Sequence, residues 1–516
     1  MKNYKVCILA AGIGSRSFDP NINKALLPLD GKAVISNIID KFEKKQKFVI
    51  ALGYLSDQVK QYLKHAHPNT KFEFVDVKKY FGVGSGPGHS LLCCENKLKC
   101  PFIITSVDTI VLENVSNPSE NWMGVAPVKN TSDFCTVQTN ANLVTRIDDK
   151  TLNDNRLAWI GLAGIKDYKY FFSCLKKNQK HTNNEIQISN GLKGLMAKSI
   201  KTQNYTWYDT GSYANYKIAK ETLEDIKFDF SKPDEYIFKL EDKIIKFFIN
   251  DNKVNLLKKR WQRLKKLTPK KLKFTKNFLS YEKFEGSTLY EVINNSIVKD
   301  LLNYLDKNLW QLKSKKISKE FHRDCLSFYK HKTKSRIDLF YKENIFNDRI
   351  YKINGVLRKK LSHYMNQIDW KIISKGIESN FHGDLQFDNI IFNNKNKIFK
   401  LIDWRSDFNN KTIKGDLYYD ISKLYAGCIL PYSQIKKGQF NFAYENQEIL
   451  FDFQVNNNLI DAKYELEKFI ERKKLDINKV KIISSIIFIN MAPLHIEPFS
   501  HLLYFLGISK LAEVLK

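Results

Sequence analysis

Apolar residues in the first 110 positions follow two alternating patterns. Continuous apolar runs predict buried strands at "YKVCILAAG" and "KFVIALGY", and "KFEFVDV" and "PFIITSVD" predict two more strands. Between them, apolar residues from Ile35 to Phe42 recur at the spacing of one helix face, and "LSDQVKQYLKHA" predicts a second helix with Ser56 as its N-cap. This rhythm predicts a doubly wound, Rossmann-like α/β domain whose sites lie at the carboxyl ends of its strands.

The pattern changes after a helix in "YANYKIAKETLEDI", which ends near Ile226. "YIFKLEDKIIKFFIND" has two strand-like runs and predicts a β-hairpin, and the chain from Val292 to Leu515 is mostly helical except for a strand-rich segment at 381–404. A length of 516 residues is too great for one ordinary core. We therefore predict an α/β domain at 1–226 and an α+β domain at 227–516, with a small lobe at about 227–290 and a helical lobe at about 291–516.

The composition is that of a soluble globular protein, with 43% hydrophobic and 27% charged residues. The net charge is 84 − 55 = +29, but the lysines are spread along the chain without a basic tail. This distribution favours anionic substrates over a nucleic-acid partner. The eight cysteines form no CxxC pair and lack zinc-site spacing, so we expect reduced, buried thiols in a cytoplasmic protein.

Two segments bear on membranes and export. The N-terminus lacks a charged region followed by an apolar run, so no signal peptide is expected. "IISSIIFINMAPLHI" is too short to span a bilayer and contains Pro493, so we expect a buried helix and no membrane span.

A glycine-rich turn, "LAAGIGSR", follows the first predicted strand. It matches neither the GxGxxG nor the GxxxxGK[ST] pattern. Backbone N–H groups of such a turn can hold phosphate oxygens, although an isolated turn of this kind is mostly structural. Arg16 adds a bidentate cation, and "NKALLPLDGK" places Lys24 near the same strand ends. The expected nucleotide-binding residues of the turn are Ala10, Ala11, Gly12 and Gly14.

This combination resembles the nucleotidyltransferases that make NDP-sugars and CDP-choline-type headgroups, over about residues 1–225. The resemblance implies that Arg16 and Lys24 are catalytic, and that a phosphate monoester attacks the α-phosphorus of an NTP while pyrophosphate leaves. Its further assignments are two Mg²⁺ ligands (Asp108 in "SVD" and Asp209 in "WYDTGSYANYKIA"), two glycines that read the base (Gly86 and Gly88 in "GSGPGHSL") and a substrate contact (Glu185 in "NNEIQISNGL").

Simpler interpretations exist for both aspartates, because Asp108 can cap a turn at a strand end and Asp209 can cap a helix. The segment before Lys24 reads "NK" where the family has "PK", and the Glu-Lys-Pro segment of many sugar enzymes is absent. The class of reaction is therefore better indicated than the class of substrate.

A second motif, "HGDLQFDN", is followed by "KLIDWR". Phosphoryl transfer to a hydroxyl group needs a carboxylate to take the proton and oxygen ligands for Mg²⁺. Asp384 suits the first role, and Asn389 and Asp403 suit the second. The intervening strand pair would bring these residues together.

The second motif resembles the aminoglycoside phosphotransferase and choline kinase family, which has a protein-kinase-like fold, over about residues 230–516. The resemblance implies that Lys246 in "IIKFFI" contacts the ATP phosphates and that Glu282 to Phe284 hold the adenine. The helix after Lys246 has no glutamate to pair with it, and Arg405 weakens a choline-like interpretation.

An acceptor with a quaternary amine would need aromatic faces or carboxylates. Trp404 is the substrate-binding candidate, and "GDLYYDISKL" adds Tyr418, Tyr419, Asp416 and Asp420. The alternative is that this stretch is a capped helix start whose aromatic residues pack in the core.

Together the two motifs predict a bifunctional enzyme that uses Mg²⁺, ATP and an NTP. The second domain would phosphorylate a small hydroxyl metabolite, and the first would couple that phosphate to a nucleotide, giving an activated headgroup for surface glycans. We favour CTP with a choline-like or other small polar alcohol. A sugar kinase with an NDP-sugar product is the close alternative, and a degenerate nucleic-acid-binding or regulatory protein is the alternative of another class. The oligomeric state stays open.

Overall fold

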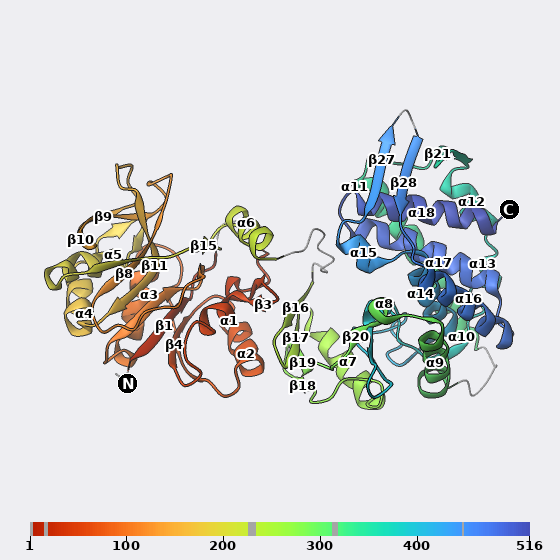
Figure 1. The fold of residues 1–516 in the computed structure, drawn as a ribbon, viewed down its shortest axis with the longest axis horizontal. Coiled ribbons are helices and arrows are strands. Elements are labelled where there is room, and N and C mark those ends of the chain that lie inside the picture. The colour runs from red at the N-terminus through yellow and green to blue at the C-terminus, as the bar shows by residue number, and fades with distance from the viewer. Residues whose placement is uncertain (1–3, 15–18, 225–233, 312–317, 446–447, 516) are drawn as a thin grey trace. The chain divides into compact units, whose positions relative to one another are not determined.

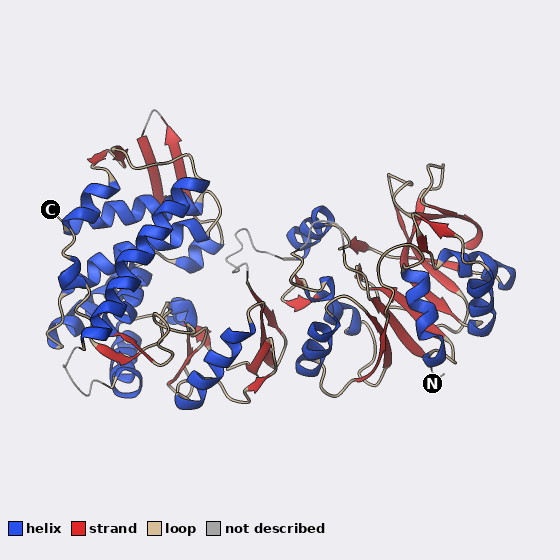
Figure 2. Cartoon of the chain, turned by 180° about the vertical axis from the view of Figure 1, so that it is seen from behind, coloured by secondary structure: helices blue, strands red, loops and turns tan. Residues whose placement is uncertain are grey.

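A computed structural model describes the chain except residues 1–3, 15–18, 225–233, 312–317, 446–447 and 516 (Figure 1). Contacts divide the chain into two compact units, which we call the first and second units. The first unit comprises Met1–Asp225, Tyr236–Ile249 and Thr275–Ser280, and the second comprises Ile226–Glu235, Asn250–Phe274 and Tyr281–Lys516. Figure 2 shows that helices dominate the second unit, whereas a large sheet dominates the first.

The sheet of the first unit has nine strands in the order β5-β4-β1-β6-β11-β8-β14-β10-β9. The strands β5, β4, β1 and β6 are parallel and confirm the four runs predicted above. The remainder is mixed, because β11 pairs antiparallel with both β6 and β8. The bounds are β1 (Lys5–Ala10), β4 (Lys47–Leu52), β5 (Lys71–Asp76), β6 (Phe102–Ser106), β8 (Trp122–Pro127), β9 (Cys135–Asn140), β10 (Leu143–Asp149), β11 (Leu157–Ile165) and β14 (Lys201–Asn204).

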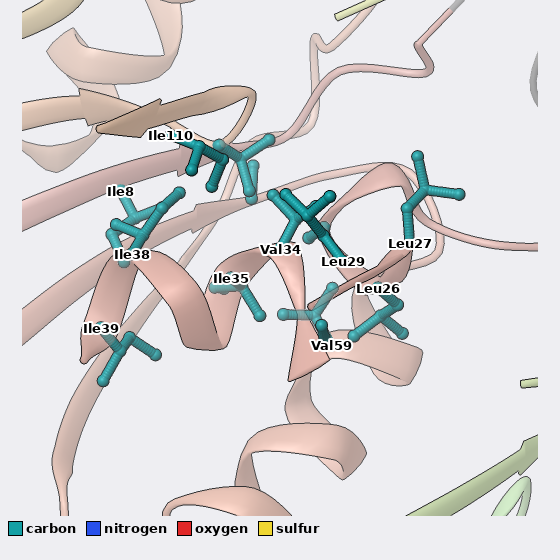
Figure 3. Close-up of a cluster of buried hydrophobic side chains, with 14 of the residues drawn as sticks. Ile8, Leu26, Leu27, Leu29, Val34, Ile35, Ile38, Ile39, Val59 and Ile110 are labelled. Carbon is teal, nitrogen blue, oxygen red and sulfur yellow. The ribbon is translucent and has the colours of Figure 1, made fainter. Parts of the chain in front are cut away.

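Helices cover both faces of this sheet. Val6 and Ile8 of β1 belong to one apolar cluster with α1 (Val34–Ile39) and α2 (Ser56–Ala66), part of which Figure 3 shows. The alternate residues of β1 belong to a second cluster with α3 (Pro87–Cys94), α4 (Tyr168–Lys177) and α5 (Ser189–Leu195). The parallel half of the sheet is therefore doubly wound, as predicted. The N-cap of α2 is Leu55 and not Ser56, which is the first residue of the helix.

The predicted hairpin is present as β16 (Glu235–Lys239) and β17 (Lys243–Phe248), and β19 (Phe278–Glu282) is the next strand of the same small sheet. Phe238 and Phe278 belong to the apolar cluster of the first unit, where their rings lie 4.9 Å and 6.2 Å from that of Tyr62. The boundary predicted at residue 226 is therefore only partly right. Two segments of the expected small lobe, Tyr236–Ile249 and Thr275–Ser280, pack with the first unit, because one face of these strands is apolar.

Three helices of the second unit, α14, α17 and α18, are buried along most of their length, and α17 packs against both of the others. The helices of this unit are α7 (Asp251–Arg263), α8 (Leu289–Val292), α9 (Asn295–Leu305), α10 (Lys319–Leu326), α11 (Lys332–Glu343), α12 (Leu361–Gln367), α13 (Trp370–Ile373), α14 (Leu417–Ile429), α15 (Tyr432–Lys436), α16 (Asn457–Arg472), α17 (Ile477–Met491) and α18 (Phe499–Val514).

Within the described residues, Ile477–Leu494 is the single helical stretch whose length and composition would let it cross a membrane, and 56% of it is buried in the protein. The length of the helix corrects the prediction that this stretch is too short to span a bilayer, whereas its burial agrees with the predicted core helix. Five of the eight free cysteines are buried, whereas Cys93 is exposed and Cys100 and Cys174 are half-buried.

The strands of the second unit are short. The pair β24 (Ile390–Asn393) and β25 (Ile398–Leu401) confirms the strand-rich segment, and β23 (Glu378–Asn380) pairs with β26 (Lys414–Asp416). A four-stranded sheet was not predicted and corrects the expectation of helix elsewhere after Val292. Its order is β22 (Val356–Arg358), β21 (Tyr351–Ile353), β28 (Glu448–Phe453) and β27 (Phe440–Glu445).

Candidate active sites

Lys24 begins the short 3-10 helix η1 (Lys24–Leu26), which the preceding residue caps. The Oδ1 atom of Asn23 accepts from the Ala25 N–H at 2.9 Å, and its Nδ2 atom donates to the Tyr54 carbonyl at 2.6 Å. Leu26 is fully buried in the core shown in Figure 3. Asn23, the departure from the family's "PK", thus fixes the backbone that carries Lys24 through side-chain bonds that proline could not make.

The two predicted metal ligands of the first unit lie side by side although they are far apart in sequence. Asp108 directly precedes β7 (Thr109–Val111), which pairs antiparallel with β15 (Trp207–Asp209) so that Asp209 stands opposite Thr109. The Thr210 N–H donates to the Asp108 carbonyl at 2.9 Å. Helix α6 (Tyr213–Leu223) begins just beyond.

Lys24 and both aspartates converge on one point. The Nζ atom of Lys24 lies 2.7 Å from Oδ2 of Asp108. A Cβ atom built on Gly211 would lie 2.9 Å from Oδ1 of Asp209 and 3.2 Å from Oδ2 of Asp108, so the two carboxylates flank the same small space. Burial raises the pKa of Asp209, and the charge of Asp108 raises it further. The structure therefore brings these three predicted residues together.

This pair of carboxylates fits Mg²⁺. Magnesium in nucleotide sites is bound through one or two carboxylates together with substrate phosphates. A cation here would relieve the repulsion between Asp108 and Asp209 that raises the pKa of Asp209. Over the described ranges, no three His, Cys, Asp or Glu side chains form a metal cage, so the remaining ligands would come from substrate and water.

The glycine-rich turn lies beside Lys24. Ala10 and Ala11 are buried at the end of β1, and a Cβ atom on Gly12 would meet only open space. Gly14 has φ +71°, and a Cβ atom there would approach Cδ of Lys24 to 3.4 Å. The turn therefore packs on the Lys24 side chain. The predicted catalytic residue Arg16 lies outside the described residues and stays a prediction.

The Gly86 segment packs tightly on β13 (Glu185–Ile186). Gly86 has φ +110°, and a Cβ atom on it would lie 2.7 Å from Cβ of Glu185. A Cβ atom on Gly88 would lie 2.7 Å from the Ile186 carbonyl. Close packing against β13 therefore explains why both positions are glycine, and Glu185 lies beside them. Their predicted contacts with the base and the substrate remain predictions.

In the second unit, the loop of the "HGDLQFDN" motif is held by a buried histidine. The Asp384 N–H donates to Nδ1 of His382 at 3.2 Å, and Nε2 of His382 lies 2.8 Å from the Ile402 carbonyl. This pattern fits a neutral imidazole with its proton on Nε2. Burial lowers the pKa of His382 to about 4, which keeps the ring neutral at pH 7.

The carboxylate of Asp384 is held by two side chains. Nζ of Lys423 lies 2.9 Å from its Oδ1 atom, and the Gln386 amide donates to the same oxygen at 3.0 Å. Burial alone would lower the pKa of Lys423, but the Asp384 carboxylate more than offsets it, so the pKa lies above its ordinary value. The sequence motif gave no indication of Lys423, which lies on α14.

Asn389 and Asp403 lie at the same end of the β24–β25 hairpin, because Ile390 pairs with Leu401. The Asn389 amide donates to the Asp384 carbonyl at 2.8 Å, which ties it to the loop of the "HGDLQFDN" motif. Asp403 has φ +55°, an uncommon backbone conformation for a residue with a side chain and one that clusters at functional sites. These residues offer amide and carboxylate oxygens, the ligand type that Mg²⁺ prefers.

Two buried charged residues, Asp420 and Arg260, hold the backbone of this loop, and the sequence analysis did not predict that role for either of them. Asp420 accepts the N–H groups of His382 and Gly383 at 2.7 Å and 2.8 Å, and burial raises its pKa to about 6. Arg260 of α7 donates to the carbonyls of Phe381, Arg405 and Thr412. Arg260 lies far from the motif in sequence and could not be linked to it. The sequence feature that could have indicated a buried role for Asp420 is its position as an acidic residue within the mostly apolar helix α14.

The aromatic candidates for the acceptor site are almost fully buried. Trp404 is 4% exposed and donates its Nε1–H to the Leu401 carbonyl at 2.9 Å, which argues against the predicted substrate contact. Tyr418 and Tyr419 are each 7% exposed. Asp416 is the N-cap of α14 and accepts the Tyr418 N–H at 3.2 Å. The capped-helix alternative is therefore right for this stretch.

The predicted ATP contacts have mixed outcomes. Lys246 is buried on β17. This lysine belongs to the first unit, whereas Asp384 belongs to the second. Glu282 ends β19 and pairs with Lys271 at 2.8 Å, and Phe284 is half-buried. Their roles in ATP binding stay predictions.

We expect His382 to make the folded protein acid-sensitive. Between pH 6.5 and about 4 this histidine binds a proton in the unfolded chain but not in the fold, so stability falls as the pH falls through this window. The effect amounts to about 3 kcal/mol at most. The raised pKa of Asp420 has the opposite effect on the pH dependence of stability. Because Asp420 is present in both the wild type and a His382→Gln variant, its effect cancels when the two proteins are compared.

The difference in melting temperature between the wild type and His382→Gln should therefore shrink from pH 7 to pH 4.5. His331→Gln changes an exposed histidine of the same unit and serves as the control. A difference that stays constant across this range would contradict the neutral, buried imidazole.

No family model matches the chain. Its N-terminal part is 27% identical over 221 residues to the Bifunctional protein GlmU of Methanococcus vannielii, covering 40% of this chain and 51% of that protein. It is 26% identical over 215 residues to the GlmU of Methanococcus maripaludis, covering 40% and 50%. The chain thus spans about half the length of the curated relatives it matches.

A solved structure of the CTP:phosphocholine cytidylyltransferase of Streptococcus pneumoniae aligns with a TM-score of 0.35 and 18% identity, covering 43% of this chain and 100% of that one. A TM-score this low does not define the fold, which rests on the strand order given above. The GlmU relatives agree with the resemblance that the N-terminal motifs indicated. The kinase-like fold of the second unit stays a prediction.

Proposed function

We propose that the first unit transfers a nucleotidyl group from an NTP to a phosphate monoester. The observation that carries this proposal is the convergence of Lys24, Asp108 and Asp209 beside the glycine-rich turn. The attacking phosphate is already anionic, so the site needs no general base and acts by neutralising charge. Lys24 would exchange its bond with Asp108 for the substrate phosphates. Asp108 and Asp209 would hold Mg²⁺, which supplies positive charge at the phosphates.

The proposal for the second unit is phosphoryl transfer from ATP to a hydroxyl group. Asp384 would accept the hydroxyl proton, and its carboxylate is oriented by Lys423 and Gln386. Asn389 and Asp403 would hold Mg²⁺ at the end of the β24–β25 hairpin. The buried His382–Asp420 network fixes the backbone of this loop, so the catalytic groups are positioned before substrate binds.

The two reactions fit in series, because the phosphate ester made by the second unit is the kind of nucleophile that the first unit would use. We favour CTP as the nucleotide and a small polar alcohol as the acceptor, giving an activated headgroup for surface glycans. A sugar acceptor with an NDP-sugar product is the competing proposal.

The test uses the full chain with Mg²⁺, ATP, one of the four NTPs and one alcohol from a panel. We expect ADP from ATP and an alcohol alone, and release of pyrophosphate from the NTP only when ATP, alcohol and the correct NTP are all present. Pyrophosphate release without ATP, or ADP formation at the same rate without any alcohol, would contradict the coupled sequence. The panel includes choline, ethanolamine and neutral sugars, so the productive alcohol also decides between the headgroup and sugar alternatives.

A further inference from the structure

Three cationic side chains lie near Asp384 in the second unit, and a fourth, Arg336, lies near two of them, Lys332 and Arg405. Lys423 contacts its carboxylate at 2.9 Å. Lys332 and Arg336 lie one helical turn apart on α11, so their side chains share one face of that helix. Arg405 follows the Asp403 turn by two residues. These cations come from three separate segments of the chain: α11, the segment after Asp403, and α14.

Arg405 lies directly against the catalytic loop. Its N–H donates to the His382 carbonyl at 3.2 Å, and a Cβ atom on Gly383 would lie 2.6 Å from Cβ of Arg405. Its guanidinium carbon lies 5.1 Å from the ring centroid of Phe328, and Nζ of Lys332 lies 4.3 Å from the same centroid. Phe328 therefore gathers the ends of both side chains, and Gly383 leaves room for Arg405 beside Asp384.

The protein balances only part of the charge in this region, because Asp384 is the carboxylate that pairs with Lys423 and that favours the charged form of Lys332. Across the part of the chain that the structure describes, no carboxylate forms an ion pair with Lys332, Arg336 or Arg405. Asp407 is close in sequence, but its carboxylate accepts bonds from Ser406 and Asn410. Burial lowers the pKa of Lys332 and of Arg336, and the charge of Arg405 lowers both further.

Half-buried like charges repel one another, and a bound anion would remove that cost. The aromatic and acidic groups that a quaternary amine needs are not offered here, because Trp404, Tyr418 and Tyr419 are packed in the core and Asp416 caps a helix. The same positive field would repel a cationic alcohol.

Building on the proposed phosphotransferase activity, we propose that its acceptor is an anionic alcohol, a hydroxyl compound that also carries a carboxylate or a phosphate group. Lys332, Arg336 and Arg405 bind the anionic group and direct the hydroxyl toward Asp384. The hydroxyl oxygen attacks the γ-phosphorus of ATP, the bond from that phosphorus to the β–γ bridging oxygen breaks, and ADP leaves. The hydroxyl proton passes to Asp384.

The test compares alcohols that differ mainly in charge: D-glycerate and glycerol 3-phosphate against glycerol, and gluconate against glucitol, with choline as the cationic probe. ADP release by the full chain is measured with saturating Mg²⁺ and ATP. We expect kcat/KM to be at least tenfold higher for an anionic member than for its neutral partner, and no turnover of choline. The carboxylate and phosphate arms show which anion the site takes.

The variant Arg336→Gln should lower kcat/KM for the anionic acceptor at least tenfold, leave the neutral partner nearly unchanged and leave KM for ATP within twofold. Lys334→Gln removes an exposed lysine of the same helix and is the matched control. An increase in KM for ATP with unchanged acceptor preference would overturn the inference, because the cations would then serve the nucleotide. Equal or faster turnover of neutral alcohols or choline would overturn it while the phosphotransferase proposal survives. Absence of ADP with every alcohol would instead remove the phosphotransferase proposal and this inference with it.

Discussion

Asp384→Ala is expected to abolish acceptor-dependent ADP formation while nucleotidyl transfer to a supplied phosphorylated acceptor persists. The carboxylate is the proton acceptor in the proposed reaction, and removing such a group costs about 10²- to 10⁴-fold. The change also leaves the buried Lys423 ammonium without its counter-charge. The first unit has its own carboxylates and lysine, so its chemistry should not depend on Asp384. ADP and pyrophosphate are measured separately on the same preparation.

The control for this variant is Asp461→Ala, which removes an exposed carboxylate on α16 of the same unit. Both activities should survive in the control. Circular dichroism and the melting temperature establish that Asp384→Ala is folded. Loss of both activities in a folded Asp384→Ala protein would refute the independence of the two sites.

Lys24→Ala is expected to lower the rate of nucleotidyl transfer by about 10²-fold or more, the scale for removing a preorganised charge-stabilising group. The ammonium lies 2.7 Å from Asp108, at the point where the phosphates would bind. Without it, the two carboxylates face the incoming phosphates with less compensation. Pyrophosphate release at saturating NTP and phosphorylated acceptor measures the effect, and ADP formation by the second unit should be unchanged.

Lys32→Ala provides the comparison, because Lys32 pairs with Asp40 on the surface of the same unit at 2.5 Å. Its rate of nucleotidyl transfer should match that of the wild type. If Lys24→Ala also retains the wild-type rate, Lys24 is a surface lysine and the site proposed around Asp108 is wrong.

Much of the first unit could be predicted because its signals are local. The buried strands are continuous apolar runs, and the glycine-rich turn and Lys24 are close in sequence. The meeting of Asp108 with Asp209 depends on the β7–β15 pairing, a contact across the whole unit. Residue patterns alone left both aspartates with simpler roles as caps, and the resemblance to known enzymes linked them.

The missed features depend on long-range packing. The apolar face of β16 and β17 could cover either neighbouring unit, and the sequence does not say which. Arg260 reaches its three carbonyl partners from α7, more than a hundred residues before them. The strands β27 and β28 do alternate apolar and polar residues, so this sheet could have been found by a stricter test of periodicity. Trp404 is a substrate candidate by sequence because it is an aromatic residue near the second motif, whereas its low exposure depends on packing that the sequence does not show.

The path of the chain between the two units limits how the protein can be divided. The chain passes from one unit to the other after Asp225, Glu235, Ile249, Phe274 and Ser280. Truncation at residue 226 would strip Phe238 and Phe278 from the core around Tyr62 and leave an apolar surface open to water. A single proteolytic cut could not separate the two units intact, because the chain passes between them five times. Expression as two fragments divided at residue 226 would yield fragments prone to aggregation. The two units are therefore expected to need one continuous polypeptide in order to fold, even if each proposed site works alone.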